Sequence, residues 1–276
     1  VLEILKTFPY IIIVYFLIYK LNKNSLNIIT VLILIMQDDE IATYIGQKGY
    51  TIIKEYMSVE EQEFLRNDLT VKPFVPKNSL VKPPSFRVYR ESKNKFYIPK
   101  FYGLENYGEP DIVKTKKGKE ILLKFNGELR EKQKPVVEKF LKNIETRKSG
   151  LLALHTGFGK TCLALYLISA LKMKTIVVVH KEFLLRQWIE RIEQFLPDAK
   201  VGRIQASTMD VEDKDIVICM LQSLSMKDYP SEIFSDFGFA IYDEVHHLGA
   251  EVFSRAFFKL TTEYSLGLSA TMKRKD

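Results

Sequence analysis

The chain of 276 residues has only two cysteines and four histidines. The few cysteines argue against a disulfide-stabilised protein, and the few histidines argue against a zinc protein. Cys162 and Cys219 both fall within apolar segments, which indicates buried thiols in a reducing compartment and argues against a disulfide framework. The histidines lack the cysteine or acidic spacing of a zinc site, so a zinc centre is not expected.

The sequence also lacks an uninterrupted hydrophobic run long enough to be a clear membrane span. The apolar run Pro9–Tyr19 and a second run at 28–36 each fall short of the roughly 18–20 residues that cross a bilayer. Two interpretations of residues 1–35 remain open. We prefer to place the initiator at Met36 and to treat 1–35 as upstream read-through. The expected location is intracellular, in the cytoplasm or nucleus, with a viral factory or a virion as further alternatives. The alternative is a marginal membrane helix within 1–19 that tethers the chain.

The overall composition is that of a globular protein with a mild positive bias. Hydrophobic residues make up 46% and charged residues 27% of the chain, and its length allows one sizeable α/β domain plus a smaller module. A net charge of +7 favours a polyanionic partner, although the bias is not specific.

A glycine-rich turn between an apolar strand and a helix is the most informative segment. The strand is expected at 151–154 and the helix at 162–171. In such a turn backbone N–H groups face phosphate oxygens, the lysine reaches the β- and γ-phosphates, and the hydroxyl next to it binds Mg²⁺. The pattern lacks its usual first glycine, since Leu154 stands there. The predicted ATP-binding residues of this segment are Thr156, Gly157, Phe158, Gly159, Lys160, Thr161 and Cys162.

A second apolar run, 237–242, ends in the acidic pair Asp243 and Glu244. A continuous apolar run is typical of a buried parallel strand, and ligands gather at the carboxyl ends of such strands. We expect Asp243 to hold Mg²⁺ together with Thr161, and Glu244 to orient and deprotonate the attacking water, with Lys160 as the third catalytic residue.

A third short strand, 264–268, precedes the small residues of Ser269-Ala-Thr271. In the order phosphate loop, Asp-Glu-Val-His, Ser-Ala-Thr, these motifs resemble those of superfamily 2 DEAD/DEAH-like helicases. Among them they most resemble helicases of large DNA viruses and phages, including the poxvirus transcript-release type. The resemblance implies that ATP hydrolysis is coupled to nucleic acid through His246, His247, Ser269 and Thr271. It also implies that Arg130 and Gln133 read the adenine, because a glutamine amide offers both a donor and an acceptor.

Two further segments resemble the strand-contacting motifs of that superfamily. The strand expected at 175–179 ends in His180 and Lys181, and the strand at 215–220 leads into Gln222 and Ser223. These four residues are expected to bind a DNA or RNA backbone without reading its sequence. The helix between the two strands, 182–195, carries the only tryptophan, Trp188, which we expect to pack in the core.

The part before the motifs, residues 36–127, is expected to be a small α+β accessory domain. Ser58 starts a helix with a capping-box pattern, and 86–90 with 95–99 alternate as a hairpin. Basic residues interleaved with aromatics in this hairpin leave two interpretations, a packing module or a nucleic-acid platform, and we prefer the first.

Together these patterns predict an α/β, RecA-like domain with a mainly parallel sheet flanked by helices at 128–276, preceded by the accessory domain and the segment 1–35. The expected function is that of the first motor lobe of an ATP-dependent helicase or translocase. The second RecA-like lobe of the superfamily is expected to lie in a longer form of the protein or in another chain, so that this chain alone is weakly active. The alternatives are a non-catalytic nucleic-acid-binding module and a membrane-tethered protein with a vestigial ATP site.

Overall fold

The structure, a computed structural model, describes residues 41–72, 85–245, 255–256 and 258–270. The interpretations of residues 1–35 and of His246, His247 and Thr271 lie outside these ranges. Among the helices in the described ranges, none combines the length and the hydrophobicity that a membrane span requires.

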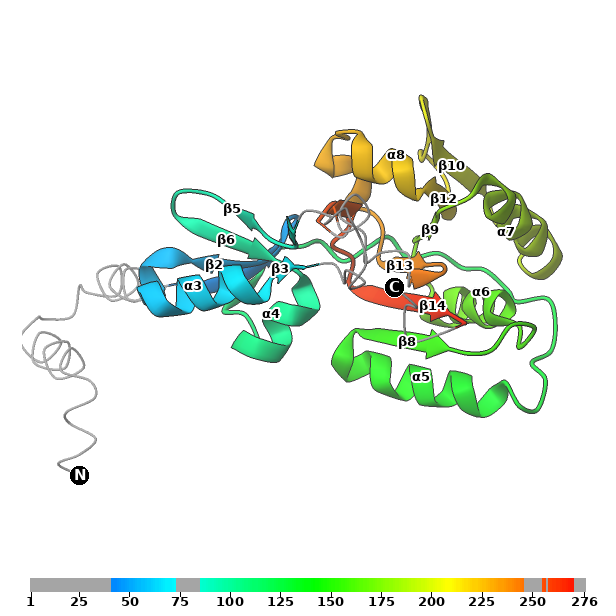
Figure 1. Cartoon of the computed structure of the whole chain (residues 1–276). Helices are drawn as coiled ribbons and strands as arrows, with labels where there is room; N and C mark the ends of the chain where they lie inside the picture. The colour runs from blue at the N-terminus through cyan, green and yellow to red at the C-terminus, as the bar shows by residue number, and fades with distance from the viewer. Residues whose placement is uncertain (1–40, 73–84, 246–254, 257, 271–276) are drawn as a thin grey trace, which may run out of the picture. The chain divides into compact units, whose positions relative to one another are not determined.

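The larger sheet has seven strands in the described ranges, in the order β11-β10-β12-β9-β13-β14-β8 (Figure 1). All neighbouring strands are parallel except β10 and β11. This arrangement confirms the predicted RecA-like domain with a mainly parallel sheet. The strands are β8 (Ser149–Ala153), β9 (Thr175–Val179), β10 (Val201–Gln205), β11 (Thr208–Asp210), β12 (Ile216–Met220), β13 (Phe239–Tyr242) and β14 (Tyr264–Ser269).

Helices cover both faces of this sheet because its central strands are apolar on both sides. Val177 and Val179 of β9 face one core, whereas Ile176 and Val178 face the other. Three helices contribute to the first core, and a short helix and a 3₁₀ turn to the second (Figure 1). They are α5 (Lys134–Arg147), α6 (Lys160–Leu171) and α7 (Glu182–Phe195) on one side, and α8 (Leu221–Met226) and η3 (Ser231–Phe234) on the other.

The described part of the accessory domain contains a five-stranded sheet in the order β5-β6-β2-β1-β7 and the two-stranded sheet β3-β4. Its core is built around the fully buried rings of Tyr50 and Phe96. Its elements are β1 (Thr43–Gly46), β2 (Gly49–Ile53), η2 (Lys54–Tyr56), α3 (Val59–Asp68), β3 (Thr70–Val71), β4 (Phe86–Arg87), β5 (Arg90–Glu91), β6 (Lys95–Ile98), α4 (Lys100–Tyr107) and β7 (Ile112–Val113).

In the accessory domain the sequence predicted the start of the helix at Ser58 correctly, but it predicted the hairpin of 86–90 with 95–99 only in part. The capping box at Ser58 is present, since its hydroxyl accepts from Glu61 N–H and the Glu61 carboxylate accepts from Ser58 N–H. The expectation of one strand over 86–90 is wrong in part. Only β5 pairs with β6, because the N–H of Val88 donates to Leu69 O and β4 pairs with β3.

An extended connection between β7 and α5 joins the accessory domain to the RecA-like domain. Ile121 N–H donates to Lys172 O and Lys174 N–H donates to Lys119 O, at 2.9 and 2.8 Å. Lys100 of α4 adds a cross-domain contact, donating to the carbonyls of Thr262 and Glu263 at 3.1 Å each. Burial lowers the pKa of this lysine to about 8, so the ammonium is held in the junction at a desolvation cost.

Gly103 provides a test of packing inside the accessory domain. A β-carbon at this position of α4 would lie 2.2 Å from Cγ of the buried Tyr50, an atom that cannot swing aside. Replacing a helical glycine by alanine normally stabilises by about 0.5–1 kcal/mol. We expect Gly103→Ala instead to destabilise by about 1–3 kcal/mol, because the core is overpacked.

Urea denaturation followed by circular dichroism measures this change. The exposed position Glu105 on the same helix gives the matched control, since Glu105→Ala should stay within about 0.5 kcal/mol of wild type. A Gly103→Ala chain as stable as wild type would contradict the described packing of α4 on Tyr50.

Candidate functional site

Three adjacent parallel strands bring the three motifs of the RecA-like domain to one edge of the sheet. β14 lies between β8 and β13, with Ser269 in register with Ala153 and Gly267 in register with Tyr242. Leu154 N–H donates to Ser269 O at 2.9 Å, so the residue entering the phosphate loop is bonded directly to the Ser-Ala-Thr motif. The phosphate loop, the acidic pair and Ser269 therefore follow neighbouring strand ends, where α/β proteins bind ligands.

The phosphate loop needs glycine at two positions for different reasons. Gly157 has φ +80° and Gly159 has φ +96°, both in the left-handed region that favours glycine. At Gly159 a β-carbon would also lie 2.6 Å from the side-chain nitrogens of Arg130 and Gln133, so both side-chain ends would have to move away from the loop. The loop then continues into α6, whose first turn includes Lys160 and the half-buried Thr161 and Cys162.

Lys160 and Glu244 form an ion pair across this edge. Their Nζ and Oε1 atoms are 3.9 Å apart, and the lysine also donates to Leu154 O at 3.2 Å. Both side chains are largely buried, with 13% and 27% of their surface exposed. Glu244 has φ +50°, an unusual backbone conformation for a residue with a β-carbon, and such strain is common at functional turns. The structure thus places the predicted base beside the phosphate-loop lysine.

Two hydrogen bonds hold the carboxylate of Asp243. Its Oδ2 accepts a 2.8 Å hydrogen bond from Nε1 of Trp188, and its Oδ1 accepts from Glu244 N–H at 3.0 Å. Burial raises the pKa of this carboxyl and the charge of Glu244 raises it further, while the Trp188 bond lowers it. The indole therefore fixes the orientation of the carboxylate and partly offsets the cost of burying it.

Sequence reasoning missed the contact that Trp188 makes with Asp243. The prediction that it packs in the core is confirmed, since it is 1% exposed. Its bond to Asp243 joins residues 55 apart in the chain. The sequence could have indicated such a contact, because the N–H of a buried indole usually donates to an acceptor.

Arg130 and Gln133 both contact the phosphate loop. Gln133 is 1% exposed, its Nε2 donates to Phe158 O at 2.9 Å, and its Oε1 accepts from Arg130 N–H at 2.9 Å. The Arg130 guanidinium donates to the same Phe158 carbonyl. In this structure their polar groups brace the loop, and adenine recognition by them stays a prediction. Burial raises the pKa of the Cys162 thiol, which favours its neutral form beside the loop.

The side chains at this edge of the sheet suit a metal ion that is bound by few protein groups and takes its other ligands from phosphate and water. The described residues contain no cluster of three or more histidine, cysteine or acidic side chains. One fixed carboxylate, Asp243, and one hydroxyl, Thr161, match Mg²⁺, which protein sites usually bind through one or two carboxylates plus phosphate oxygens and water.

The four predicted backbone-binding residues lie at the ends of two neighbouring strands. Lys181 follows β9 and is exposed, and Gln222 at the start of α8 donates from Nε2 to His180 O at 2.9 Å. Ser223 is 9% exposed, and its hydroxyl accepts from Ala206 N–H at 2.9 Å. The structure brings the two motifs together, with Lys181 and Gln222 as the exposed members.

Comparisons of sequence place the chain in a family. Residues 126–274 match the family model described as Type III restriction enzyme, res subunit. The chain is 38% identical over 243 residues to "Putative ATP-dependent RNA helicase L396" of Acanthamoeba polyphaga mimivirus, covering 86% of this chain and 47% of that protein. It is 32% identical to "Putative helicase 109L" of Invertebrate iridescent virus 3, over 65% of this chain and 57% of that protein.

An archaeal relative and a solved structure extend these findings. The chain is 37% identical to "DNA 3'-5' translocase XPB2" of Sulfurisphaera tokodaii, over 56% of this chain and 33% of that protein. It therefore spans about half the length, or less, of most of these relatives. The crystal structure of the UvsW helicase from bacteriophage T4 superposes with a TM-score of 0.54 at 17% identity, covering 83% of this chain and 92% of that chain. This likeness supports the fold. From the family match and the viral relatives, the chain belongs to the family described as Type III restriction enzyme, res subunit, as the N-terminal RecA-like lobe of a superfamily 2 helicase similar to those of large DNA viruses.

Proposed function

We propose that this lobe binds Mg-ATP and takes part in its hydrolysis to drive a helicase or translocase along nucleic acid. The observation that carries the proposal is the 3.9 Å pair of Lys160 and Glu244, which joins the phosphate loop to the acidic motif. The names of the relatives, an ATP-dependent RNA helicase and a DNA translocase, support the same activity.

The residues at the strand ends divide the work of binding nucleotide. The backbone amides of Thr156 to Thr161 face the phosphates, and Lys160 supplies the positive charge at the β- and γ-phosphates. Thr161 and Asp243 hold Mg²⁺, Asp243 directly or through water. When bound, the ion neutralises phosphate charge as it develops in the reaction. Arg130 and Gln133 carry adenine recognition.

Glu244 serves as the base that orients and deprotonates water, and its neighbours set its surroundings. The ammonium of Lys160 lies 3.9 Å from the Glu244 carboxylate and pairs with it at this edge of the sheet. Trp188 acts as a positioning residue, since its bond fixes Asp243 and thereby the ion expected there. The coupling role proposed for His246, His247, Ser269 and Thr271 rests on the family resemblance and, for Ser269, on its backbone bond to Leu154.

Nucleic acid is proposed to bind through His180, Lys181, Gln222 and Ser223, by contacts to the backbone that do not depend on sequence. A second RecA-like lobe is proposed to complete both the track and the ATP site. An arginine supplied by such a partner accelerates nucleotide hydrolysis by about 10³–10⁵ in related phosphoryl-transfer enzymes, so turnover by residues 1–276 alone is expected to be slow.

Removing the phosphate-loop lysine tests nucleotide binding. Lys160→Ala deletes the fixed charge at the phosphates, and a hydrogen bond between charged groups contributes about 1.5–3 kcal/mol, so ATP affinity should fall about 10–100-fold. Titration with a fluorescent ATP analogue in Mg²⁺ measures it. Lys142→Ala, at an exposed position of α5, removes the same charge away from the site and should bind as wild type does. Equal affinities of all three chains would overturn the assignment of the phosphate loop.

Replacing the proposed base tests catalysis separately from binding. Glu244→Gln keeps the shape and most of the hydrogen bonding but cannot accept the proton, so ATP affinity should stay within about twofold while turnover falls about 10²–10⁴-fold. Single-turnover release of labelled phosphate, followed over hours with added single-stranded nucleic acid, suits the slow wild-type reaction. If the variant turns ATP over at the wild-type rate, another group is the base.

The indole bond to Asp243 makes a third prediction. Trp188→Phe removes the N–H donor while keeping an aromatic ring in the core, and loss of such a supporting bond typically weakens metal affinity or activity about 10–100-fold. The Mg²⁺ concentration needed for half-maximal ATP binding should therefore rise. Ile192→Val, on the same helix and equally buried, makes a small core deletion without touching Asp243 and should leave the Mg²⁺ requirement unchanged. If Trp188→Phe and wild type need the same Mg²⁺ concentration for half-maximal ATP binding, the indole bond does not position Asp243 for the ion.

A further inference from the structure

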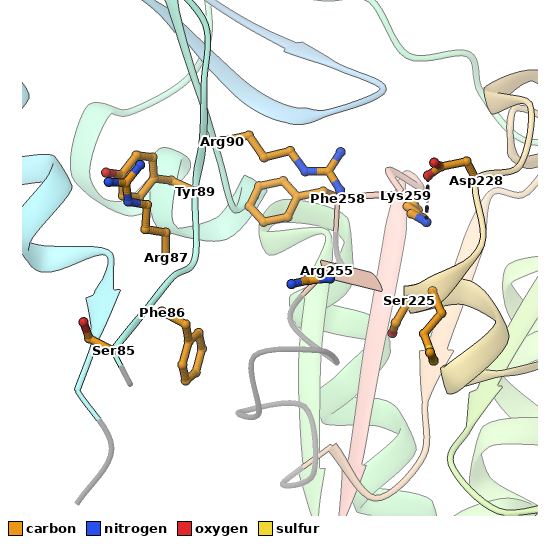
Figure 2. Close-up of a pocket in the computed structure, with 11 residues that line it drawn as sticks. Ser85, Phe86, Arg87, Tyr89, Arg90, Ser225, Asp228, Arg255, Phe258 and Lys259 are labelled. Carbon is orange, nitrogen blue, oxygen red and sulfur yellow. Dashed lines mark hydrogen bonds and ion pairs between the residues drawn. The ribbon is translucent and has the colours of Figure 1, made fainter. Parts of the chain in front are cut away.

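A cavity of about 700 Å³ lies where the accessory domain meets the RecA-like domain, away from the phosphate loop (Figure 2). Its lining contains four basic side chains, Arg87 and Arg90 from the accessory domain and Arg255 and Lys259 from the other side. Among the described residues that line it, Asp228 is the one acidic side chain, and its Oδ1 is 3.4 Å from Lys259 Nζ. The cavity is therefore strongly positive, and both domains supply its charge.

Two of its guanidinium groups rest on buried rings. Arg90 Cζ lies 5.3 Å from the centroid of Phe258, across the junction, and Arg87 Cζ lies 5.8 Å from that of Tyr89 (Figure 2). Both rings are nearly inaccessible, at 5% and 6% exposed. Stacking holds a guanidinium by its face and leaves its N–H groups directed outward in the plane, which suits them to phosphate oxygens. The arginines are thus pre-organised for an anion.

The cavity also adjoins the proposed nucleic-acid track. Ser225 and Met226 in its wall belong to α8, the short helix that begins with Leu221 and Gln222. At 1.5 Å of rise per residue, Gln222 and Met226 are about 6 Å apart along the helix axis. A strand held at Gln222 therefore needs little further length to reach the wall of the pocket at Met226.

We propose that this cavity, named here the junction pocket, binds the phosphodiester backbone of the same nucleic-acid strand. The accessory domain then supplies part of the track through Arg87 and Arg90, rather than serving only as a packing module. The rings of Tyr89 and Phe258 are covered, so they hold the arginines instead of stacking on bases. Contacts from arginine to phosphate should not depend on base identity. The inference rests on the proposed function.

The test is the salt dependence of binding to labelled single-stranded DNA and RNA, measured by fluorescence anisotropy. Each phosphate contact to a single strand contributes about 0.7 to the slope of log K against log salt. Arg87→Gln and Arg255→Gln should each lower the slope by about 0.7, and the double variant by about 1.4. Arg87→Lys should restore the slope, since the charge is kept. Arg203→Gln removes an exposed arginine of β10 outside the pocket lining and should leave the slope unchanged.

The outcomes separate this inference from the proposed function. If Lys181→Gln lowers the slope while Arg87→Gln and Arg255→Gln bind like wild type, the junction pocket is wrong and the track stands. If wild type shows no salt-dependent binding to either strand, the nucleic-acid proposal itself fails, and the junction pocket with it. ATP affinity should be unchanged in every pocket variant, and thermal unfolding checks each fold. If Arg87→Lys shows the same reduced salt slope as Arg87→Gln, the proposed contact between the charge at position 87 and a phosphate is wrong.

Discussion

The parallel pairing of β8, β14 and β13 is the constraint on which the candidate site depends. In a parallel ladder all strands end at the same edge, so a fixed register also fixes the distances between the loops that follow. Here the bond from Leu154 to Ser269 and the pairing of Ser269 with Ala153 lock the phosphate loop to the Ser-Ala-Thr strand. A slip in either register would separate Lys160 from Glu244, however well each motif kept its local shape.

The charges at this edge are partly buried, and the cost of burying each one is offset by a partner. An unpaired buried charge is costly, and removing one member of such a pair leaves the other uncompensated. Lys160 is bonded to Leu154 O and paired with Glu244, while Asp243 takes its two donors from Trp188 and from the backbone. The edge therefore carries two carboxylates and one ammonium that are positioned by contacts within the protein, and such pre-organisation reduces the reorganisation that binding requires.

Much of the RecA-like domain could be predicted because its signals are local. The bounds predicted for 175–179 and 182–195 coincide with β9 and α7, since a buried β-branched run and an amphipathic helix each show in their own residues. Features set by distant partners could not be predicted. The division of 86–90 between two sheets depends on Leu69, and the role of Trp188 depends on Asp243. Adjacent basic and aromatic residues such as Tyr89 and Arg90 left two interpretations open, because alternation alone does not show which side chains face a cavity.

The bond between Trp188 and Asp243 gives the protein an internal optical probe. The chain contains a single tryptophan, so all indole emission arises at the carboxylate expected to face Mg²⁺. The indole excited state is sensitive to nearby charge and to the strength of the hydrogen bond that its N–H donates. Binding of Mg-ATP at the proposed site is therefore expected to change the intrinsic fluorescence, and stopped-flow emission would then time ligand arrival and departure without any attached label.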